Sequence, residues 1–321
     1  MHDEERHNLY ARLLADAESG SVTCGTFLAS LPPLDRSHLY IKLLYERLER
    51  KLKRVEELHT MADGHWTQTF YLLYLRTLGD IQNQPAYLEL ARRAPLQILL
   101  RERLIPHAIE SILLGTAGLL DLYDAEDDHI AYLRREFDHY AAKYSLEPME
   151  ASSWVYQQVR PANHPVLRLA QAAAFFSRYA SLFDQMLMCR TAEEVEDLFC
   201  VEADPYWNSR LKVDEEETSR HTPKRLGRFK AQIIGINLVA ILQYAYGSYC
   251  GQEHLRDRAI ALLEHLPPED NRYMRIWRQA GLRPRDSFES QALLQLITEH
   301  CQQQGCASCC VAREIARRLR P

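Results

Sequence analysis

Glycine is scarce in this sequence, and runs that alternate between apolar and polar residues are missing. Only 12 of the 321 residues are glycine. We find no stretch with the two-residue period of a half-buried strand bounded by turns. These absences argue against a β-sheet. Almost every segment longer than ten residues instead has helical periodicity, so the sequence predicts a protein built from helices.

Long apolar runs without charge are also missing. No stretch reaches the roughly 18 residues that a membrane-spanning helix needs. The first residues, MHDEERHNLYARLL, are charged and amphipathic and lack the apolar core of a signal peptide. We therefore expect a cytoplasmic protein with no membrane contact. In that compartment the eight cysteines are expected to be thiols or metal ligands rather than disulfides.

The charge balance gives no general preference for anionic partners. The net charge is −5 and the pI is near 6.2, so binding to nucleic acid would need a local basic patch. The apolar fraction of 46% and the charged fraction of 26% are ordinary for a globular protein. We predict one helical domain over residues 1–321, with a soft boundary near 203–223.

Two segments are apolar around nearly the whole helical circumference. The first is RPANHPVLRLAQAAAFFSRYASLFDQMLM (160–188), in which Pro165 suits the first helical position. The second is 224–249, with IIGINLVAIL at its centre. Such helices must be covered by other helices or by lipid, and the charged residues inside 160–188 argue against lipid. The predicted fold is therefore all-α: an irregular multi-helical bundle of αα-hairpins around two buried central helices.

The other helices are predicted from their apolar period and from proline, glycine and capping residues at their ends. They cover 3–18, 35–59, 63–79, 84–93, 95–114, 127–145, 192–200, 252–265, 269–281, 287–302 and 309–319. Pro106 is expected to kink or split the helix in which it lies. We expect residues 19–34 and 203–223 to form loops.

Cysteines gather near the end of the chain, in HCQQQGCASCC (300–310). Cys301 would close one helix and Cys309 would open the next, with Cys306 in the turn between them. Three thiolates there suit zinc or an iron–sulfur cluster. For the fourth ligand we choose Cys24, which is expected in a loop, because Cys310 would point away from Cys309. The alternative is that these cysteines are reduced and act as small apolar side chains at a helix turn.

A second candidate site surrounds the start of the first central helix. Arg160, Asn163 and Arg168 lie near its N-terminus, where free N–H groups and the positive end of the helix dipole favour anions. Two arginines would add bidentate contacts to phosphate or carboxylate. The alternative is that Arg160 pairs with an acidic side chain or caps a neighbouring carbonyl.

The C-terminal segment VAREIARRLRP is basic. Arg313, Arg317, Arg318 and Arg320 fall close together, and a basic helix end of this kind can contact nucleic acid. Cations at a helix C-terminus are also favourable by themselves, which is the plainer interpretation.

Catalytic motifs are missing. We find no HExxH, no GxSxG, no glycine-rich phosphate loop and no pair of carboxylates on one short helix. His129 and His139 lie among acidic residues on a helix that we expect to be solvated, where surface histidines are the default. No catalytic residue is predicted, and no motif supports an enzyme.

A series of longer motifs occurs in order along the chain. These include HWTQTFYLLYLRTLGDIQN (65–83), LLGTAGLLD (113–121), RPANHPVLRLAQ (160–171), DPYW (204–207) and NRYMRIWRQAGL (271–282). Together they resemble the bacterial family called domain of unknown function 2851, over essentially the whole chain. The resemblance implies cysteines where Cys24, Cys301, Cys306 and Cys309 stand. It also implies the RP-x-N-x-P-x-x-R pattern that begins at Arg160.

Members of that family usually carry an additional amino-terminal α/β segment similar to a restriction-endonuclease core. We expect this chain to correspond to the part that follows this segment, so the resemblance carries no nuclease residues over to it. We therefore expect a helical scaffold or interaction domain with an unknown protein partner, with zinc or an iron–sulfur cluster as the only cofactor. The alternative is a nucleic-acid-associated accessory domain that works with a nuclease-like chain, supported by Arg160, Arg168 and the basic tail.

Overall fold

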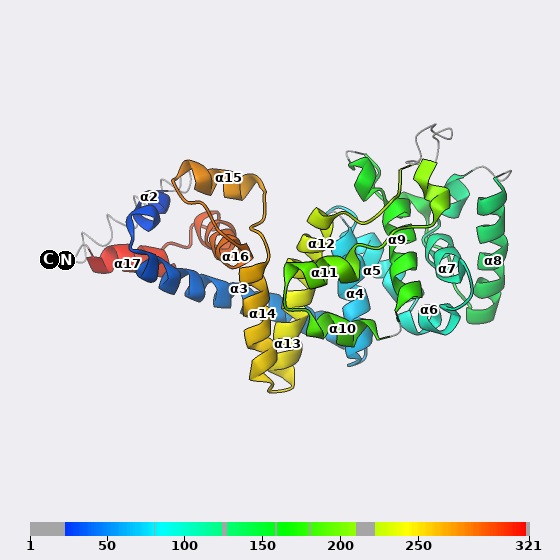
Figure 1. Cartoon of the computed structure of the whole chain (residues 1–321), viewed down its shortest axis with the longest axis horizontal. Coiled ribbons are helices and arrows are strands. Elements are labelled where there is room, and N and C mark those ends of the chain that lie inside the picture. Colours follow the sequence, from blue (N-terminus) through cyan, green and yellow to red (C-terminus); the bar gives the residue numbers. More distant parts are fainter. Residues whose placement is uncertain are drawn as a thin grey trace. The chain divides into compact units, whose positions relative to one another are not determined.

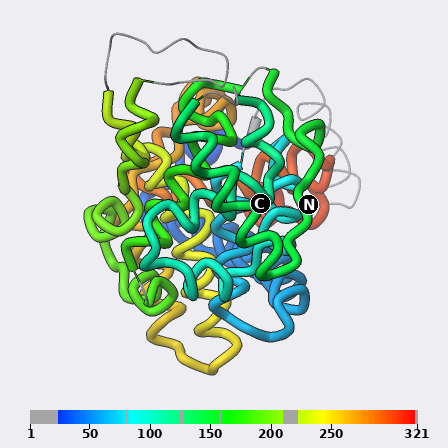
Figure 2. Tube along the Cα trace, turned by 90° about the vertical axis from the view of Figure 1, so that its right-hand side faces the viewer, coloured from blue at the N-terminus to red at the C-terminus, as the bar shows by residue number. Residues whose placement is uncertain are grey.

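The computed structural model describes residues 23–79, 81–123, 127–157, 159–179, 181–209 and 222–318. Throughout these residues the chain forms helices and connecting loops, as Figures 1 and 2 show. Strand-like pairing in the described part is limited to one isolated antiparallel bridge between Glu202 and Arg225. The predicted all-α, multi-helical fold is confirmed.

The chain forms two compact units. The first unit combines Met1–Arg54 with Tyr244–Pro321, and the second unit is Val55–Gln243. The chain passes from one unit to the other within α3 (Pro33–Met61) and within α13 (Ala240–Tyr249). Each unit is described by itself below.

The first unit has its own apolar core. Its other helices are α2 (Thr23–Ser30), α14 (Glu253–His265), α15 (Arg272–Gln279), α16 (Ser287–Gln295) and α17 (Cys310–Arg318). Leu28, Leu43 and Leu293 are completely buried in this core beside Trp277. The Trp277 indole N–H donates to the carbonyl of Leu293 at 3.1 Å, so its one polar atom is satisfied.

The second unit is built around aromatic side chains. Its helices are α4 (Trp66–Leu78), α5 (Gln84–Arg93), α6 (Leu96–Glu102), α7 (Ala108–Thr116), α8 (Asp128–Tyr144), α9 (Pro165–Arg178), α10 (Leu182–Met188), α11 (Ala192–Phe199) and α12 (Arg228–Ile234). The Phe175 ring of α9 stacks on Tyr74 at 4.8 Å and on Phe199 at 5.1 Å. Helix α9 is therefore tied to α4 and α11 through one ring cluster.

Helix α9 is the buried central helix that the sequence predicts, but it is shorter than expected. Phe175 and Phe176 have no exposed surface. The predicted single helix through residue 188 is wrong, because Tyr179 leaves helical geometry with φ −128° and ψ 141°. Arg178 lies 5.0 Å from the centre of the Tyr179 ring. The chain then starts α10 at Leu182.

The second predicted central helix is present and contains an irregular turn. Helix α12 continues through a π-helical turn at Gly235–Val239 into α13. Ile236 is 2% exposed, as the prediction requires. The side-chain amide of Asn237, in the π-helical turn, donates to the Ile233 carbonyl at 3.3 Å. The polar group inside this apolar run is thus bonded within its own helix.

The predicted break in the helix near Pro106 is confirmed, whereas one predicted loop is wrong. The helix expected over 95–114 divides into α6 and α7 around Pro106, as predicted. The loop expected over 19–34 is wrong from Thr23 to Ser30, where α2 forms. Gly25 in α2 lies against α15, and a β-carbon there would be 2.4 Å from that of Ala280. This glycine therefore permits close helix packing rather than a turn. The predicted helix at 3–18 lies outside the described residues.

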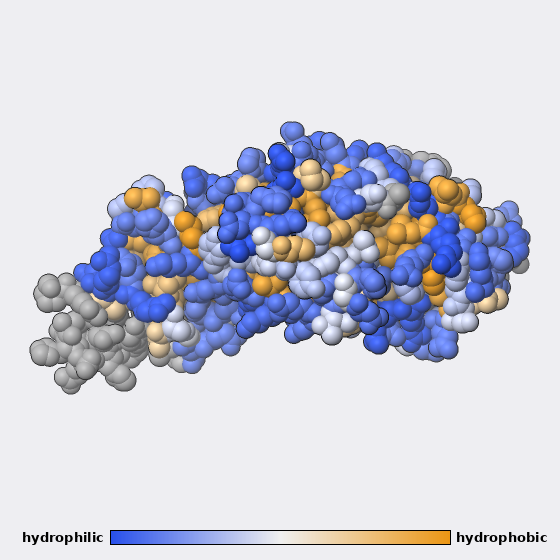
Figure 3. Space-filling model, turned by 90° about the horizontal axis from the view of Figure 1, so that it is seen from below, coloured by the Kyte–Doolittle hydropathy of each residue, from blue (hydrophilic) through white to orange (hydrophobic). Residues whose placement is uncertain are grey.

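The described helices show no candidate for a membrane crossing, since none is both long and apolar enough. The face drawn in Figure 3 is mostly hydrophilic, with apolar side chains visible between the polar ones.

Candidate functional site

The start of α9 brings two of the three predicted anion-site residues into direct contact. Arg168 is only 5% exposed, and its guanidinium donates to Oδ1 of Asn163 at 2.6 Å and to Oε1 of Gln171 at 2.9 Å. Both acceptors are neutral amides. Gln171 in turn donates to the Lys224 carbonyl at 3.1 Å, which fixes the segment before α12 beside α9. These two bonds hold the Arg168 guanidinium in place at the start of α9.

A cavity of about 770 Å³ opens at this point. Its cationic lining residues are Arg160, Arg168, Lys224, Arg225 and Lys230, and no aspartate or glutamate is among the described residues that line it. Phe229 also lines the cavity, and this residue is 59% exposed. The cavity therefore combines several positive charges with an exposed aromatic ring.

Backbone carbonyls position two of these cations. Arg225 Nε donates to the Cys200 carbonyl at 2.7 Å, and Lys230 Nζ donates to the Thr77 carbonyl at 2.7 Å. Arg160 is exposed, and no described carboxylate forms an ion pair with it. The alternative interpretation of Arg160, as the partner of an acidic side chain, is therefore not seen in the described residues.

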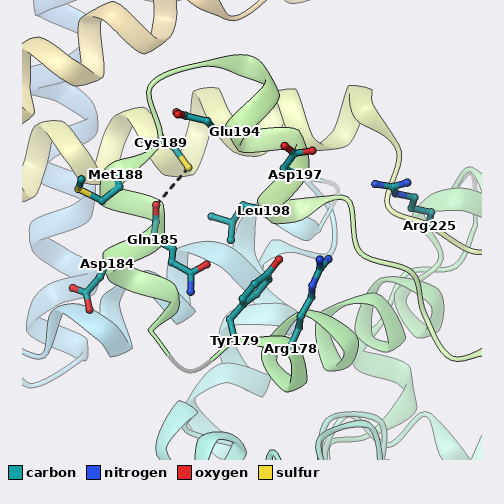
Figure 4. A pocket seen from close by; sticks show the side chains of 10 residues that line it. All are labelled: Arg178, Tyr179, Asp184, Gln185, Met188, Cys189, Glu194, Asp197, Leu198 and Arg225. Carbon is teal, nitrogen blue, oxygen red and sulfur yellow. Dashed lines mark hydrogen bonds between the residues drawn. The ribbon is translucent and has the colours of Figure 1, made fainter.

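A second cavity of the second unit, of about 740 Å³, has a different charge pattern. Figure 4 shows its lining, in which Asp184, Glu194 and Asp197 accompany Arg178 and Arg225. Carboxylates here offset the arginines. Cys189, which also lines this cavity, donates its thiol to the Gln185 carbonyl at 3.5 Å, and burial raises its pKa to about 12. The thiol therefore stays protonated near neutral pH and is not a thiolate nucleophile.

The four cysteines predicted to bind metal lie around one core, in the first unit. Cys306 and Cys309 are buried in it, while Cys24 on α2 and Cys301 pack against it. Burial, with the nearby Cys309 and Cys306, raises the pKa of Cys301 to about 12. The pKa of Cys309 is lowered, because the Cys310 thiol and backbone amides of α17 donate to its sulfur. Cys24 lies on a helix and not in the expected loop.

A tighter group of metal-ligating atoms occurs in the second unit. Among the described residues, it is His107, Glu110 and His129, and not the cysteines, whose ligand atoms all lie within 4.8 Å of one another. The metal clasp of Cys24, Cys301, Cys306 and Cys309 therefore stays a prediction.

The interpretation of His129 as a surface residue is wrong. Its side chain is 18% exposed, and its ring stacks on Tyr206 with centroids 4.0 Å apart. Burial lowers the pKa of His129, whereas a hydrogen bond to Glu110 raises the pKa of His107. The sequence feature that could have indicated this group is the spacing of His107 and Glu110, which lie three residues apart at the start of α7. His129 itself is far from them in sequence.

The basic tail is occupied by local ion pairs. Arg317 and Arg318 contact Glu314 at 2.6 Å and 2.8 Å, and Arg318 also contacts Asp35 at 2.5 Å. Arg320 lies outside the described residues. Carboxylates therefore offset the charges of Arg317 and Arg318, which favours the plainer interpretation of this tail.

The fold and this cavity define an all-helical protein with a candidate anion-binding pocket. The chain belongs to the family described as protein of unknown function (DUF2851), whose model matches residues 2–272. Cys24 and the α9 cavity lie inside the matched range, and the three C-terminal cysteines lie beyond it. No curated protein and no solved structure matches the chain.

Proposed function

We propose that this protein is a nucleic-acid-binding helical module that holds a single-stranded segment at the α9 cavity and works beside a nuclease-like partner chain. The observation that carries the proposal is the cavity lining itself. Five cationic residues converge there, and no described lining residue is acidic, although the whole chain has a net charge of −5.

The cations match the phosphate backbone. Placing several like charges together costs free energy through mutual repulsion, and an anion that binds among them relieves that repulsion. Phosphates also release counterions when lysine and arginine neutralise them, which supplies most of the affinity in non-specific binding. The α9 N-terminus adds its positive dipole end, where the His164 side chain makes no capping bond.

The exposed ring distinguishes a nucleic acid from a small inorganic anion. Phe229 is exposed within the same lining, and bases stack on such rings at about 1–3 kcal/mol each. A scaffold that only organises other proteins would need neither the exposed ring nor a cluster of five cationic residues in one cavity. The helical scaffold nevertheless remains the architectural basis of the proposal, since the bundle positions every lining residue.

The test is fluorescence anisotropy with a labelled single-stranded DNA or RNA of about 15 nucleotides at low ionic strength. Arg160→Gln and Lys224→Gln should each reduce the salt slope of binding by about one. Phe229→Ala should weaken binding about tenfold or more, because it removes base stacking.

The matched control is Arg135→Gln, which removes an exposed arginine on α8 and should leave binding unchanged. Absence of binding at low ionic strength contradicts the proposal. So does an equal loss in the Arg135→Gln variant, because binding would then follow net charge and not the cavity.

A further inference from the structure

A partly buried group of nitrogen and oxygen atoms in the second unit is separate from the α9 cavity. His107 precedes α7 in the left-handed conformation, with φ 58° and ψ 2°, and Glu110 lies in the first turn of that helix. His129 comes from the first turn of α8. Asp204 approaches from the segment before the short helical turn Pro205–Ser209. Four side chains from three segments thus meet at one place.

The distances between these side chains suit a shared ion better than direct bonds. Glu110 Oε2 lies 3.2 Å from His107 Nδ1 and 3.9 Å from His129 Nε2. Asp204 Oδ2 lies 3.8 Å from the same His107 nitrogen. Two of these three separations are too long for a hydrogen bond. Ligand atoms around a zinc ion each lie about 2.0–2.2 Å from the metal, which requires separations of this size between them.

One nitrogen of the group makes no hydrogen bond within the described structure. His129 Nε2 is buried and has no partner there, although it faces Glu110. A buried polar atom left in this state costs about 1–3 kcal/mol. Glu110 is itself only 4% exposed, so a buried carboxylate lies beside it. A divalent cation between them would satisfy the nitrogen and neutralise the carboxylate.

The surrounding residues orient the ligand atoms. The Trp207 indole N–H donates to Glu110 Oε1 at 2.6 Å, which leaves Oε2 directed at the two histidines. His129 is held by its stack on Tyr206, whose hydroxyl donates to Asp127 Oδ2 at 2.9 Å. Outer partners of this kind fix the ligands in metal sites and contribute to metal affinity.

We propose that His107, Glu110 and His129, with Asp204 as an additional oxygen ligand, form a binding site for a divalent transition-metal ion, with zinc as the expected metal. Two imidazoles and a carboxylate suit zinc or ferrous iron, and they do not suit calcium or magnesium, which take oxygen ligands. This site uses none of the residues assigned to nucleic-acid binding.

The site opens on a cavity of about 430 Å³ that His107, Glu110 and Asp204 help to line. The small residues Ala170, Ala173 and Ala174 of α9 line it as well, which leaves space next to the ion. A coordination position facing this cavity would accept water or an oxygen atom of a small anionic ligand. With Asp204 as the fourth protein ligand, this position would make the ion five-coordinate, which zinc in catalytic sites can become.

The test uses the full chain, stripped of metal with a chelator and titrated with Co²⁺ as a spectroscopic substitute for zinc. Visible ligand-field bands without thiolate charge-transfer absorption should appear at one Co²⁺ per chain. His129→Gln and His107→Gln should remove these bands or weaken binding by about 100-fold. His139→Gln, an exposed histidine on the same helix α8, is the matched control and should bind as the unmodified chain does.

A second measurement does not depend on changing a ligand. Bound Co²⁺ should quench the fluorescence of Trp207, so Trp207→Phe should lose most of the quenching signal. Absence of binding by the unmodified chain overturns the proposal. Binding that persists in both folded histidine variants, or bands that carry thiolate charge transfer alone, overturns it as well. Because nucleic-acid binding is measured without metal, failure of one proposal is distinguishable from failure of the other.

Discussion

Arg168 Nη2 donates to Oδ1 of Asn163 across a distance of 2.6 Å, so a nearly buried cation is held by a neutral amide. The bond joins the turn before α9 to the first turn of the helix itself. Hydrogen bonds to a charged group stabilise a protein by roughly 1.5–3 kcal/mol, more than those between neutral groups. The Arg168–Asn163 hydrogen bond should therefore contribute measurably to the free energy of unfolding.

Asn163→Ala should lower the free energy of unfolding by about 2 kcal/mol, because it removes this acceptor from a buried guanidinium. The measurement is urea unfolding followed by circular dichroism. Gln157→Ala, at an exposed position a few residues earlier, should change stability by less than about 0.5 kcal/mol. Equal stability of the two variants would show that the Arg168 cation is satisfied by other means.

The capping box at the start of α11 gives a second prediction. Thr191 Oγ1 accepts from the Glu194 amide at 3.2 Å, and Glu194 Oε2 accepts from the Thr191 amide at 3.2 Å. Thr191→Ala should cost about 1 kcal/mol, whereas Thr191→Ser keeps the hydroxyl and should cost little. Thermal unfolding of the two variants measures the difference. A similar loss in both would point to packing of the threonine methyl group and not to the cap.

Close packing of α2 against α15 gives a third prediction. Gly25→Ala would place a β-carbon 2.4 Å from that of Ala280, so the two helices must separate. We expect a loss of about 1–3 kcal/mol in unfolding free energy from this overpacking. Gly227→Ala, where nothing lies within 4 Å of the added carbon, serves as the control. Chemical denaturation compares them, and an unchanged Gly25→Ala would mean that α2 does not pack as described.

The ion pairs of Glu314 predict a pH dependence. Hydrogen bonds from Arg317 and Arg318 lower the pKa of Glu314 from 4.5 to about 2. The folded chain therefore holds this carboxylate charged more strongly than the unfolded chain does. Its contribution to stability is present above pH 4.5 and is lost as the pH falls through about 2.

Glu314→Gln should accordingly reduce the urea midpoint slightly at pH 7, and the difference should shrink as the pH falls through about 2. The effect is small because exposed arginines supply the partners and water screens them. High salt should reduce it further at pH 7. A constant difference between the two proteins across this pH range would show that packing of the side chain, not its charge, is responsible.

The metal content of the purified protein tests whether the four cysteines bind a metal. If Cys24, Cys301, Cys306 and Cys309 share a metal, freshly purified protein should contain about one zinc, or iron with sulfide, per chain in addition to any metal held by His107, Glu110 and His129. Cys24→Ser should then destabilise the fold, while Cys250→Ser, at an exposed thiol, should not. Metal-free protein in which all eight thiols react freely with a thiol reagent would contradict the clasp.

The helical architecture could be predicted because its signals are local. Helix α5 spans Gln84–Arg93, as its apolar period and Pro85 indicate, and the division near Pro106 follows from the missing proline N–H. Arg168 and Asn163 could be predicted to meet for the same reason, since five residues separate them at one helix start. Local spacing is enough for such features.

Features that depend on packing between distant segments could not be predicted. Glycine is typical of loops, so Gly25 suggested a loop in the sequence. Its close contact with Ala280, at the end of α15, explains why glycine is needed inside a helix. His129 meets His107 and Glu110 because α7 and α8 lie side by side, which no spacing in the sequence records. Lys224, Arg225, Phe229 and Lys230 join the α9 cavity through tertiary contacts of the same kind.

The division into two units has a consequence for biosynthesis. The second unit is one continuous stretch, Val55–Gln243, whereas the first is assembled from both sides of it. On the ribosome, the continuous unit can fold once its own residues have emerged. The early helix α2 must wait for α15 and α17, translated more than two hundred residues later, before its apolar face is covered. During that delay α15 and α17 cannot cover this face.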